Sequence, residues 1–394
     1  MLIRIASVLC LILAMAACGD NGPADVGTGT VQVTTVSTGQ DMDPNGYLVQ
    51  VQGAGFQPIG INATATLAEV TAGDVEVGLA GMQGNCTVQG IHPRIIRVVA
   101  SETFSMHFDV ACVHSPLLGR ILFDSGRDGN RELYSMNPDG SDVVRLTTTP
   151  DDQESHAASS PNGTRILFES TPGPYGSDVV DPAIYVMNAD GSGRVNLSNG
   201  SYGDQAPVWS PDGSRVAFTS SYSRAEGIDV WVMNADGTGL VNLTNSPTPN
   251  EYVPTWSPDG SRILYTVADG ATSDLYVMNA DGSGQTRLTD DPGYAGFGTW
   301  SPDGQRIAFR STDNGVSKIF RMNADGSGRT TLTNTAGAES PSWSPDGGRL
   351  AFQNLTLGPE NREIYLVSAD GTGLVNISSS PASFEALGPQ AWGP

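Results

Sequence analysis

The chain has 394 residues, a formal net charge of −22 and a single lysine, Lys318, which excludes the basic phosphate-binding face that nucleic acid requires. Hydrophobic residues make up 38% of the chain and charged residues 16%, so more than one core can form and two domains are predicted. The 48 glycines and 25 prolines recur at fixed places in periodic segments, which predicts an all-β chain with many tight turns.

Residues 1–17 are predicted to be a signal peptide. One positive charge at Arg4 precedes the apolar run 5–14, which is too short to span a bilayer. The run ends in Met-Ala-Ala-Cys-Gly, which resembles a bacterial lipobox, so acylation of Cys18 would anchor the protein to a membrane. Met15 stands where a leucine is usual, and cleavage after Ala14-Met15-Ala16 without a lipid stays open. We expect an exported protein in the bacterial envelope, on the periplasmic or the surface face.

Residues 18–30 lack apolar periodicity and are expected to be a flexible tether. Short alternating runs such as YLVQVQ and VEVGLA follow over 31–113, separated by Gly, Pro, Asn and Asp, and they predict a small β-sandwich. This stretch resembles the PEGA-like and immunoglobulin-like modules of bacterial envelope proteins, and the segments DPNGYLVQVQG and NCTVQG carry the resemblance. The resemblance implies a spacer without a ligand of its own.

Four cysteines are present, and Cys10 leaves with the signal peptide. If Cys18 carries the lipid, Cys86 and Cys112 remain as a pair in an oxidising compartment, which predicts a disulfide. Two buried free thiols are the alternative. Because no CxxC spacing occurs, a thiol-based zinc or redox site is not expected.

From residue 120 onward the chain consists of six repeats. Each has an arginine followed by a short apolar strand, a turn of the Asn-Ala-Asp-Gly kind after an apolar strand, and a closing Leu-Thr or its variant. Ser-Pro-Asp-Gly and Asn-Ala-Asp-Gly suit tight turns between strands, so each repeat predicts a four-stranded sheet. The arginines are Arg120, Arg165, Arg215, Arg262, Arg306 and Arg349.

A Ser-Pro turn precedes the arginine strand in five repeats and is missing from the first. Residues 390–394, QAWGP, read as the same strand cut off at its turn. We therefore expect the C-terminal strand to complete the first sheet and close a ring of six sheets, which leaves no open sheet edge in the ring.

The motifs PxWSPDGxRIAF and IYVMNADGSG with Leu-Thr resemble the TolB-like propeller repeat over 120–394. The resemblance implies a six-bladed β-propeller, and its family role is to bind the peptidoglycan-associated lipoprotein and link it to the Tol complex. Here a predicted sandwich replaces the α/β N-terminal domain of TolB, which leaves a Tol role open. The resemblance favours a monomeric, non-catalytic binding or scaffold module whose partner is another envelope protein or a peptide segment.

The alternative is a lyase or hydrolase acting on an envelope or extracellular polymer. Related propellers gate prolyl-oligopeptidase-like enzymes, but the chain has no G-x-S-x-G motif. Oligogalacturonide lyases resemble the repeat and use several histidines around a metal, whereas only His156 of four histidines lies in the repeats. The run 124–132 is rich in oxygen ligands but fits a hairpin turn better than a calcium loop. No cofactor and no metal site are predicted.

The expected working surface is one mouth of the central channel, on the loops that lead from each Leu-Thr to the next inner strand. Carboxylates ringed around a narrow opening would focus a negative potential, and aromatic rings would supply anchor area, a combination suited to a basic or amide-rich peptide. The alternative is that these acids are ordinary solvent-exposed loop residues without a binding role. The candidate residues are Glu154, His156, Tyr202, Asp204, Glu251, Tyr252, Phe297, Glu339, Phe384 and Glu385.

Overall fold

The computed structural model describes residues 27–39, 46–80, 86–112, 116–173, 181–198, 203–222, 227–246, 248–270, 272–290, 293–355, 362–378 and 384–394. These residues form strands, turns and loops, and eight four-stranded sheets contain the strands. Among them is no helix that could cross a lipid bilayer. The predicted signal peptide, Cys18 and Tyr202 lie outside the described residues.

Two compact units hold the sheets, one centred on residues 46–80 and 90–108 and the other containing 116–394. The first eight strands form two antiparallel sheets, with the orders β4-β1-β8-β6 and β3-β2-β5-β7. Because β1 begins at Thr28, residues 28–30, which were expected in the tether, belong to a strand. The eight strands are β1 (Thr28–Gly39), β2 (Tyr47–Val51), β3 (Gly55–Ile59), β4 (Thr64–Thr71), β5 (Gly73–Ala80), β6 (Cys86–Val88), β7 (Arg94–Val98) and β8 (Thr103–Cys112).

Alternation of buried and exposed side chains gives these sheets one inner and one outer face. In β2, Tyr47, Val49 and Val51 are buried while the side chains between them are exposed. A disulfide joins Cys86 and Cys112, which are cross-strand partners in β6 and β8.

The other six sheets form a propeller in which each sheet is one blade. Its strands are buried on both faces, as in β9 and β10, because each blade packs between two others. The inner strands are β12 (Asp152–Ser159), β16 (Gln205–Trp209), β20 (Asn250–Trp256), β24 (Ala295–Trp300), β28 (Ala338–Trp343) and β32 (Glu385–Ala386). The second strands are β13 (Arg165–Pro172), β17 (Arg215–Ser220), β21 (Arg262–Asp269), β25 (Arg306–Asp313), β29 (Arg349–Asn354) and β9 (Ile121–Ser125).

Each repeat adds a third and an outer strand to its blade, and the outer strands are only two residues long. Short outer strands expose few unpaired backbone groups, which limits association edge to edge. The third strands are β10 (Glu132–Met136), β14 (Ala183–Asn188), β18 (Asp229–Asn234), β22 (Thr272–Asn279), β26 (Val316–Asn323) and β30 (Glu363–Ser368). The outer strands are β11 (Val144–Arg145), β15 (Val195–Asn196), β19 (Val241–Asn242), β23 (Thr286–Arg287), β27 (Thr330–Thr331) and β31 (Val375–Asn376).

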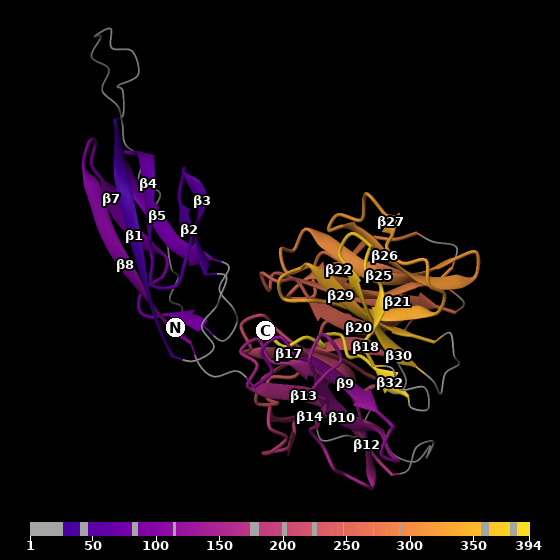
Figure 1. Ribbon diagram of the computed structural model, residues 1–394. Helices are drawn as coiled ribbons and strands as arrows, with labels where there is room; N and C mark the ends of the chain where they lie inside the picture. Colours follow the sequence, from indigo (N-terminus) through magenta and orange to yellow (C-terminus); the bar gives the residue numbers. More distant parts are fainter. Residues whose placement is uncertain are drawn as a thin grey trace, which may run out of the picture. The chain divides into compact units, whose positions relative to one another are not determined.

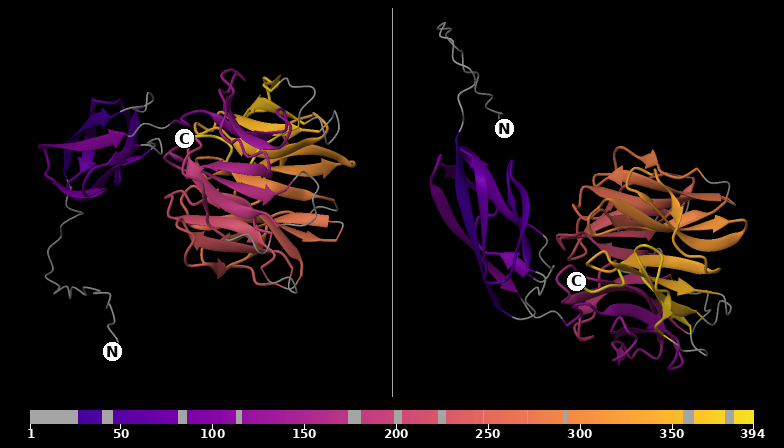
Figure 2. Two further views of the ribbon diagram at one scale, coloured as in Figure 1. Left: turned by 90° about the horizontal axis from the view of Figure 1, so that it is seen from below. Right: turned by 45° about the horizontal axis from the view of Figure 1, so that its top comes forward.

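The C-terminal strand completes the first blade, as the sequence predicted. The colours pass in order around the propeller in Figure 1 and Figure 2, and yellow β32 lies against β9. Glu385 pairs with Ser125, and Trp392 forms a further bridge to Ile121. Pairing thus begins earlier than residue 390, where the strand was expected to start.

The repeated motifs pack neighbouring blades together. The Arg215 guanidinium lies 4.5 Å from the ring centroid of Trp256 in the next blade, a cation–π contact. The glycine of each Asn-Ala-Asp-Gly turn lies on the backbone of the preceding blade. At the join of the ring, a Cβ on Gly140 would be 2.1 Å from the Ile377 carbonyl oxygen, so only glycine fits at this seam.

Candidate binding site

The inner strands share an irregularity that directs side chains toward the axis of the ring. In five of them the strand register shifts at a bulge, and one non-glycine residue in each has φ between 49° and 53°. This left-handed conformation is unfavourable for such residues, and the surrounding ladder holds it in place. The residues concerned are His156, Ala206, Val253, Phe297 and Ser340.

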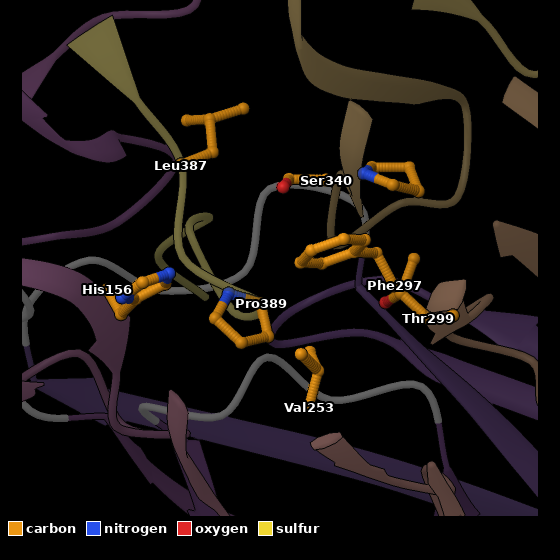
Figure 3. Close-up of a pocket in the computed structure, with 9 residues that line it drawn as sticks. His156, Val253, Phe297, Thr299, Ser340, Leu387 and Pro389 are labelled. Carbon is orange, nitrogen blue, oxygen red and sulfur yellow. The ribbon is translucent and has the colours of Figure 1, made fainter. Parts of the chain in front are cut away.

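Four of these five residues line a small cavity of about 20 Å³, together with Leu387 and Pro389 of the C-terminal segment (Figure 3). Figure 3 shows Pro389 between the rings of His156 and Phe297. A cavity of this volume has room for about one water molecule. The channel is therefore narrow at this depth.

An insertion in the closing strand explains the obstruction. Glu251 and Trp256 are five positions apart in β20, and the corresponding pairing positions, Glu385 and Trp392, are seven apart. The extra length bulges inward as the segment 387–390. Its Gln390 side chain accepts a hydrogen bond from the Trp209 backbone nitrogen at 2.9 Å and donates one to the Trp209 carbonyl at 3.0 Å.

The structure corrects the expected exposed ring of carboxylates. Four of the predicted acids are 0–4% exposed and so lie in the protein interior, three of them at one register position of an inner strand and Asp204 directly before β16. In β24 and β28 buried alanines take this position. The four acids are Glu154, Asp204, Glu251 and Glu385.

These buried acids hold the loops that lead into the inner strands. Glu154 accepts a hydrogen bond from Thr149 at 2.6 Å and lies 3.1 Å from the Arg194 guanidinium. Glu251 accepts a hydrogen bond from Ser246 at 2.7 Å. Burial raises the pKa of each of these two glutamates to about 7. Burial also raises the pKa of Asp204, although hydrogen bonds from Ser198 and Ser220 act in the opposite direction and lower it.

The other predicted residues do not gather at one surface. Glu339 is partly exposed and pairs with Arg310 at 2.8 Å, and Phe384 lies under two guanidinium groups, those of Arg131 and Arg362. Tyr252 is partly buried, next to Glu251 in β20. Glu339 is thus the one predicted acid in the described residues that is not buried, and the expected ring of exposed acids does not form there.

His156 pairs with a buried carboxylate. Its Nδ1 lies 2.9 Å from Oε1 of Glu169, an ion-pair contact that is not well directed as a hydrogen bond. Burial is the largest single effect and would lower the pKa of His156, but the nearby carboxylates of Glu169 and Asp124 together outweigh it, and the pKa is raised overall. Burial likewise raises the pKa of Glu169, and the nearby imidazole outweighs it and leaves the pKa lowered. The two groups hold each other in their charged forms.

A larger cavity of about 650 Å³ opens at the opposite ends of the inner strands, where the Ser-Pro turns lie. We call it the cup. Because residues of all six blades line it, it lies on the axis of the ring, with Pro389 and Gln390 among its lining residues. The cup is walled by Trp256, Trp300, Trp343 and Trp392 and by Pro161, Pro211, Pro258, Pro302, Pro345 and Pro394.

The cup is mostly apolar. Its tryptophans are more than nine-tenths buried and present only an edge, whereas Pro258, Pro302 and Pro345 are exposed. Asp346 and Arg349 supply its charged side chains. Within the described residues no group of three or more histidine, cysteine, aspartate or glutamate side chains has the arrangement of a metal site.

Six four-stranded blades closed by the C-terminal strand define a β-propeller protein. Residues 175–394 match the TolB beta propeller domain, and the chain belongs to that family.

The chain resembles an uncharacterized protein of Agrobacterium fabrum, with 33% identity over 109 residues that cover 25% of this chain and 35% of the relative. It resembles the Tol-Pal system protein TolB of Geobacter metallireducens, with 32% identity over 92 residues that cover 23% of this chain and 19% of the relative. The solved structure of TolB from Acinetobacter baumannii shares the fold, with a TM-score of 0.58 and 22% identity over 68% of this chain and 66% of that one.

A pH prediction follows from Glu251. Its pKa is about 7 in the folded protein and near 4.5 when unfolded, so folding favours the protonated acid. This group therefore makes the protein lose stability as the pH rises from about 4.5 through about 7. We expect Glu251→Gln to remove this part of the pH dependence and to raise the melting temperature by a few degrees at about pH 8.

Thermal melts at about pH 5 and about pH 8 test this expectation. The matched control is Glu339→Gln, because Glu339 is partly exposed and paired with Arg310. The control should keep the wild-type difference between the two pH values. A Glu251→Gln protein that loses as much stability as wild type between them would contradict the assignment.

Proposed function

We propose that this protein is a non-catalytic binding module of the bacterial envelope that captures a segment of another envelope protein in the cup. The observation that carries the proposal is the cup itself, a cavity of about 650 Å³ on the propeller axis with apolar walls. Its volume is typical of ligand pockets, which are usually about 300–1,000 Å³. The relatives that carry the name TolB support the role of a protein-binding propeller.

The chemistry of the cup selects an apolar anchor on the partner. Exposed proline rings at Pro258, Pro302 and Pro345 and the indole edges between them gain most from burial under a hydrophobic or aromatic side chain. The segment 387–390 narrows the channel beyond the cup, so we expect the partner segment to end in the cup and not to pass through the ring. This anchor differs from the basic peptide that an exposed ring of acids would have attracted.

We expect Pro258→Arg and Pro302→Arg, made together, to abolish capture of the partner, because two guanidinium groups in the cup would lose hydration on binding. The measurement is pull-down from envelope extract with the full-length protein. Thr286→Arg on the exposed outer strand β23 is the matched control and should capture normally. Equal capture by the double variant, at an unchanged melting temperature, would move the binding surface away from the cup.

The proposed organisation places this propeller, residues 120–394, behind a signal peptide at 1–17, a tether that starts at Cys18 and a β-sandwich spacer at 31–113. A lipid on Cys18 would hold the protein at the membrane. We expect wild type to partition into the detergent phase and Cys18→Ser to appear in the aqueous phase or remain unprocessed. A mature N-terminus downstream of Cys18 without a lipid would refute the anchor while leaving the cup untouched.

A second candidate function is a lyase or hydrolase reaction on a polymer. The pair of His156 and Glu169 supports it, because His156 lines the small cavity. A cavity of about 20 Å³ admits no polymer, so this function needs the segment 387–390 to leave the channel. Depolymerisation that His156→Ala abolishes would favour catalysis. Polymer that stays intact with the wild-type protein would leave binding as the function.

A further inference from the structure

The first compact unit carries a groove of about 280 Å³ on the sheet β3-β2-β5-β7, separate from the cup. We call it the sheet groove. It lies on the outer face of the sheet, where the exposed side chains of β2 and β5 alternate with buried ones. Its lining residues are Gln50, Gln52, Glu76, Gly78, Leu79, His92 and Pro93.

Gly78 lets His92 and Pro93 pack directly on the face of the sheet, beside Gln50, the cross-strand partner of Gly78. A Cβ at this position would lie 3.2 Å from Pro93 and 3.4 Å from His92 Nε2, which is tighter than ordinary contact. The groove is therefore a fixed feature of the sheet and of the segment that crosses beside it.

The orientation of His92 is also fixed. Its Nε2 accepts a hydrogen bond from the Leu79 backbone nitrogen at 2.7 Å. A neutral imidazole that accepts at Nε2 carries its proton on Nδ1, so the ring keeps a donor for a further partner. The side chain also packs edge-on against buried Phe108, with ring centroids 5.6 Å apart.

Three more polar groups complete the groove. Gln50, Gln52 and Glu76 are exposed, and within the described chain no other side chain engages the Gln50 amide or the Glu76 carboxylate. A glutamine amide both donates and accepts, and a carboxylate accepts. Together with His92 they offer a mixed set of donors and acceptors, which matches the hydroxyl groups of a sugar better than a single charged group.

Apolar side chains flank this polar strip on both sides. Phe56 is 60% exposed and lies opposite Gln50, and Ile95 is 75% exposed and lies opposite Glu76. An exposed aromatic ring beside hydrogen-bonding groups gives a ligand one face to stack on and several groups to bond. Sugar rings present this combination of an apolar face and a polar edge.

We propose that the sheet groove binds a segment of neutral polysaccharide. Its charged lining group is Glu76 and the whole chain carries −22, so acidic polymers are repelled. A peptide cannot add here as a strand, because the backbones of β2 and β5 already pair with each other across the groove. Recognition therefore depends on side chains. Phe56 stacks on the sugar ring, and the glutamine amides form hydrogen bonds with its hydroxyl groups.

Binding of the full-length protein to a printed array of neutral and acidic oligosaccharides tests the proposal. We expect at least one neutral class to bind, and the matching soluble polysaccharide to slow the protein in affinity electrophoresis. Phe56→Ala and Gln50→Ala should each weaken this binding by about tenfold or more, which corresponds to about 1.4 kcal/mol. Because both side chains are exposed, the variants should melt like wild type.

Matched controls lie on the other sheet of the same unit. Phe104→Ala removes an exposed aromatic ring of β8, and Glu102→Gln removes an exposed acid beside it, and neither should change sugar binding. The cup variants Pro258→Arg and Pro302→Arg should also bind sugar normally, which separates this site from the proposed function. Binding only to acidic sugars, only to peptides, to no glycan, or equally by the Phe56→Ala protein would overturn the proposal.

Discussion

A protein lacking residues 390–394 is expected to unfold about 10 °C or more below the full-length chain. Trp392 is 8% exposed, and loss of a buried tryptophan alone costs about 3–5 kcal/mol, at about 2–4 °C for each kcal/mol in a domain of this size. The truncation also removes the hydrogen bonds from Leu122 nitrogen to Ala391 oxygen, at 2.7 Å, and from Gly393 nitrogen to Arg120 oxygen, at 2.8 Å. Glu385 and Ala386 stay paired with β9, but Ile121 and Leu122 at the start of β9 lose their inner neighbours.

Circular dichroism or calorimetry measures this effect, and two point variants separate its parts. Trp392→Ala removes the side chain and its hydrogen bond to the Ser342 carbonyl, at 3.1 Å, but keeps the backbone pairing, so its loss should be smaller. Val375→Ser on outer strand β31 is the control, because Val375 is 55% exposed. A truncated protein that melts with wild type would show that the ring does not depend on its C-terminal strand.

Removal of the disulfide should have the second largest effect. Cys86 and Cys112 are 26 positions apart, and a bridge over such a loop contributes about 3.5 kcal/mol in the chain-entropy model. We expect Cys86→Ala with Cys112→Ala to lower the transition of the N-terminal sheets by about 15 °C, since small domains shift by about 4–8 °C for each kcal/mol. The propeller transition should stay in place.

Calorimetry of the oxidised and the reduced protein provides the comparison. Reductant should shift the wild-type transition toward that of the double variant and should leave the double variant itself unchanged. Mass spectrometry of unreduced peptides checks that the bridge is formed in the sample. Two free thiols in the mature protein, or identical melts with and without reductant, would remove the disulfide from the account of stability.

The propeller was predictable because its turns depend on residues that are close together in the sequence. Ser-Pro-Asp-Gly and Asn-Ala-Asp-Gly fix tight turns through φ at proline and glycine, and six copies in one order set the number of blades. Closure was predictable from the missing Ser-Pro turn of the first repeat. The start of β32 was not, because the inserted residues before Trp392 hide the register of Glu385.

The site was harder to predict because burial depends on contacts between distant residues. In the sequence Glu251 looks like an ordinary acid in a loop. Only the register of β20 shows that its side chain is buried beside Ser246. The bulge that directs Val253 and Ser340 to the axis has no signature in residue type, since both are ordinary strand or loop residues. In the sequence the Ser-Pro motif indicates only a turn, because one repeat cannot show that five such turns and the C-terminal segment enclose one cavity.

Closure by β32 also sets an order of events during synthesis. The first blade of the propeller is the last to be completed, since β9 waits for a strand more than 250 residues downstream. Until Glu385 and Trp392 arrive, the nascent propeller carries an open inner edge that can pair with other chains. Long-range pairing of this kind folds slowly. The propeller therefore stays incomplete until β32 has been synthesised. During this period the chain is most prone to aggregate.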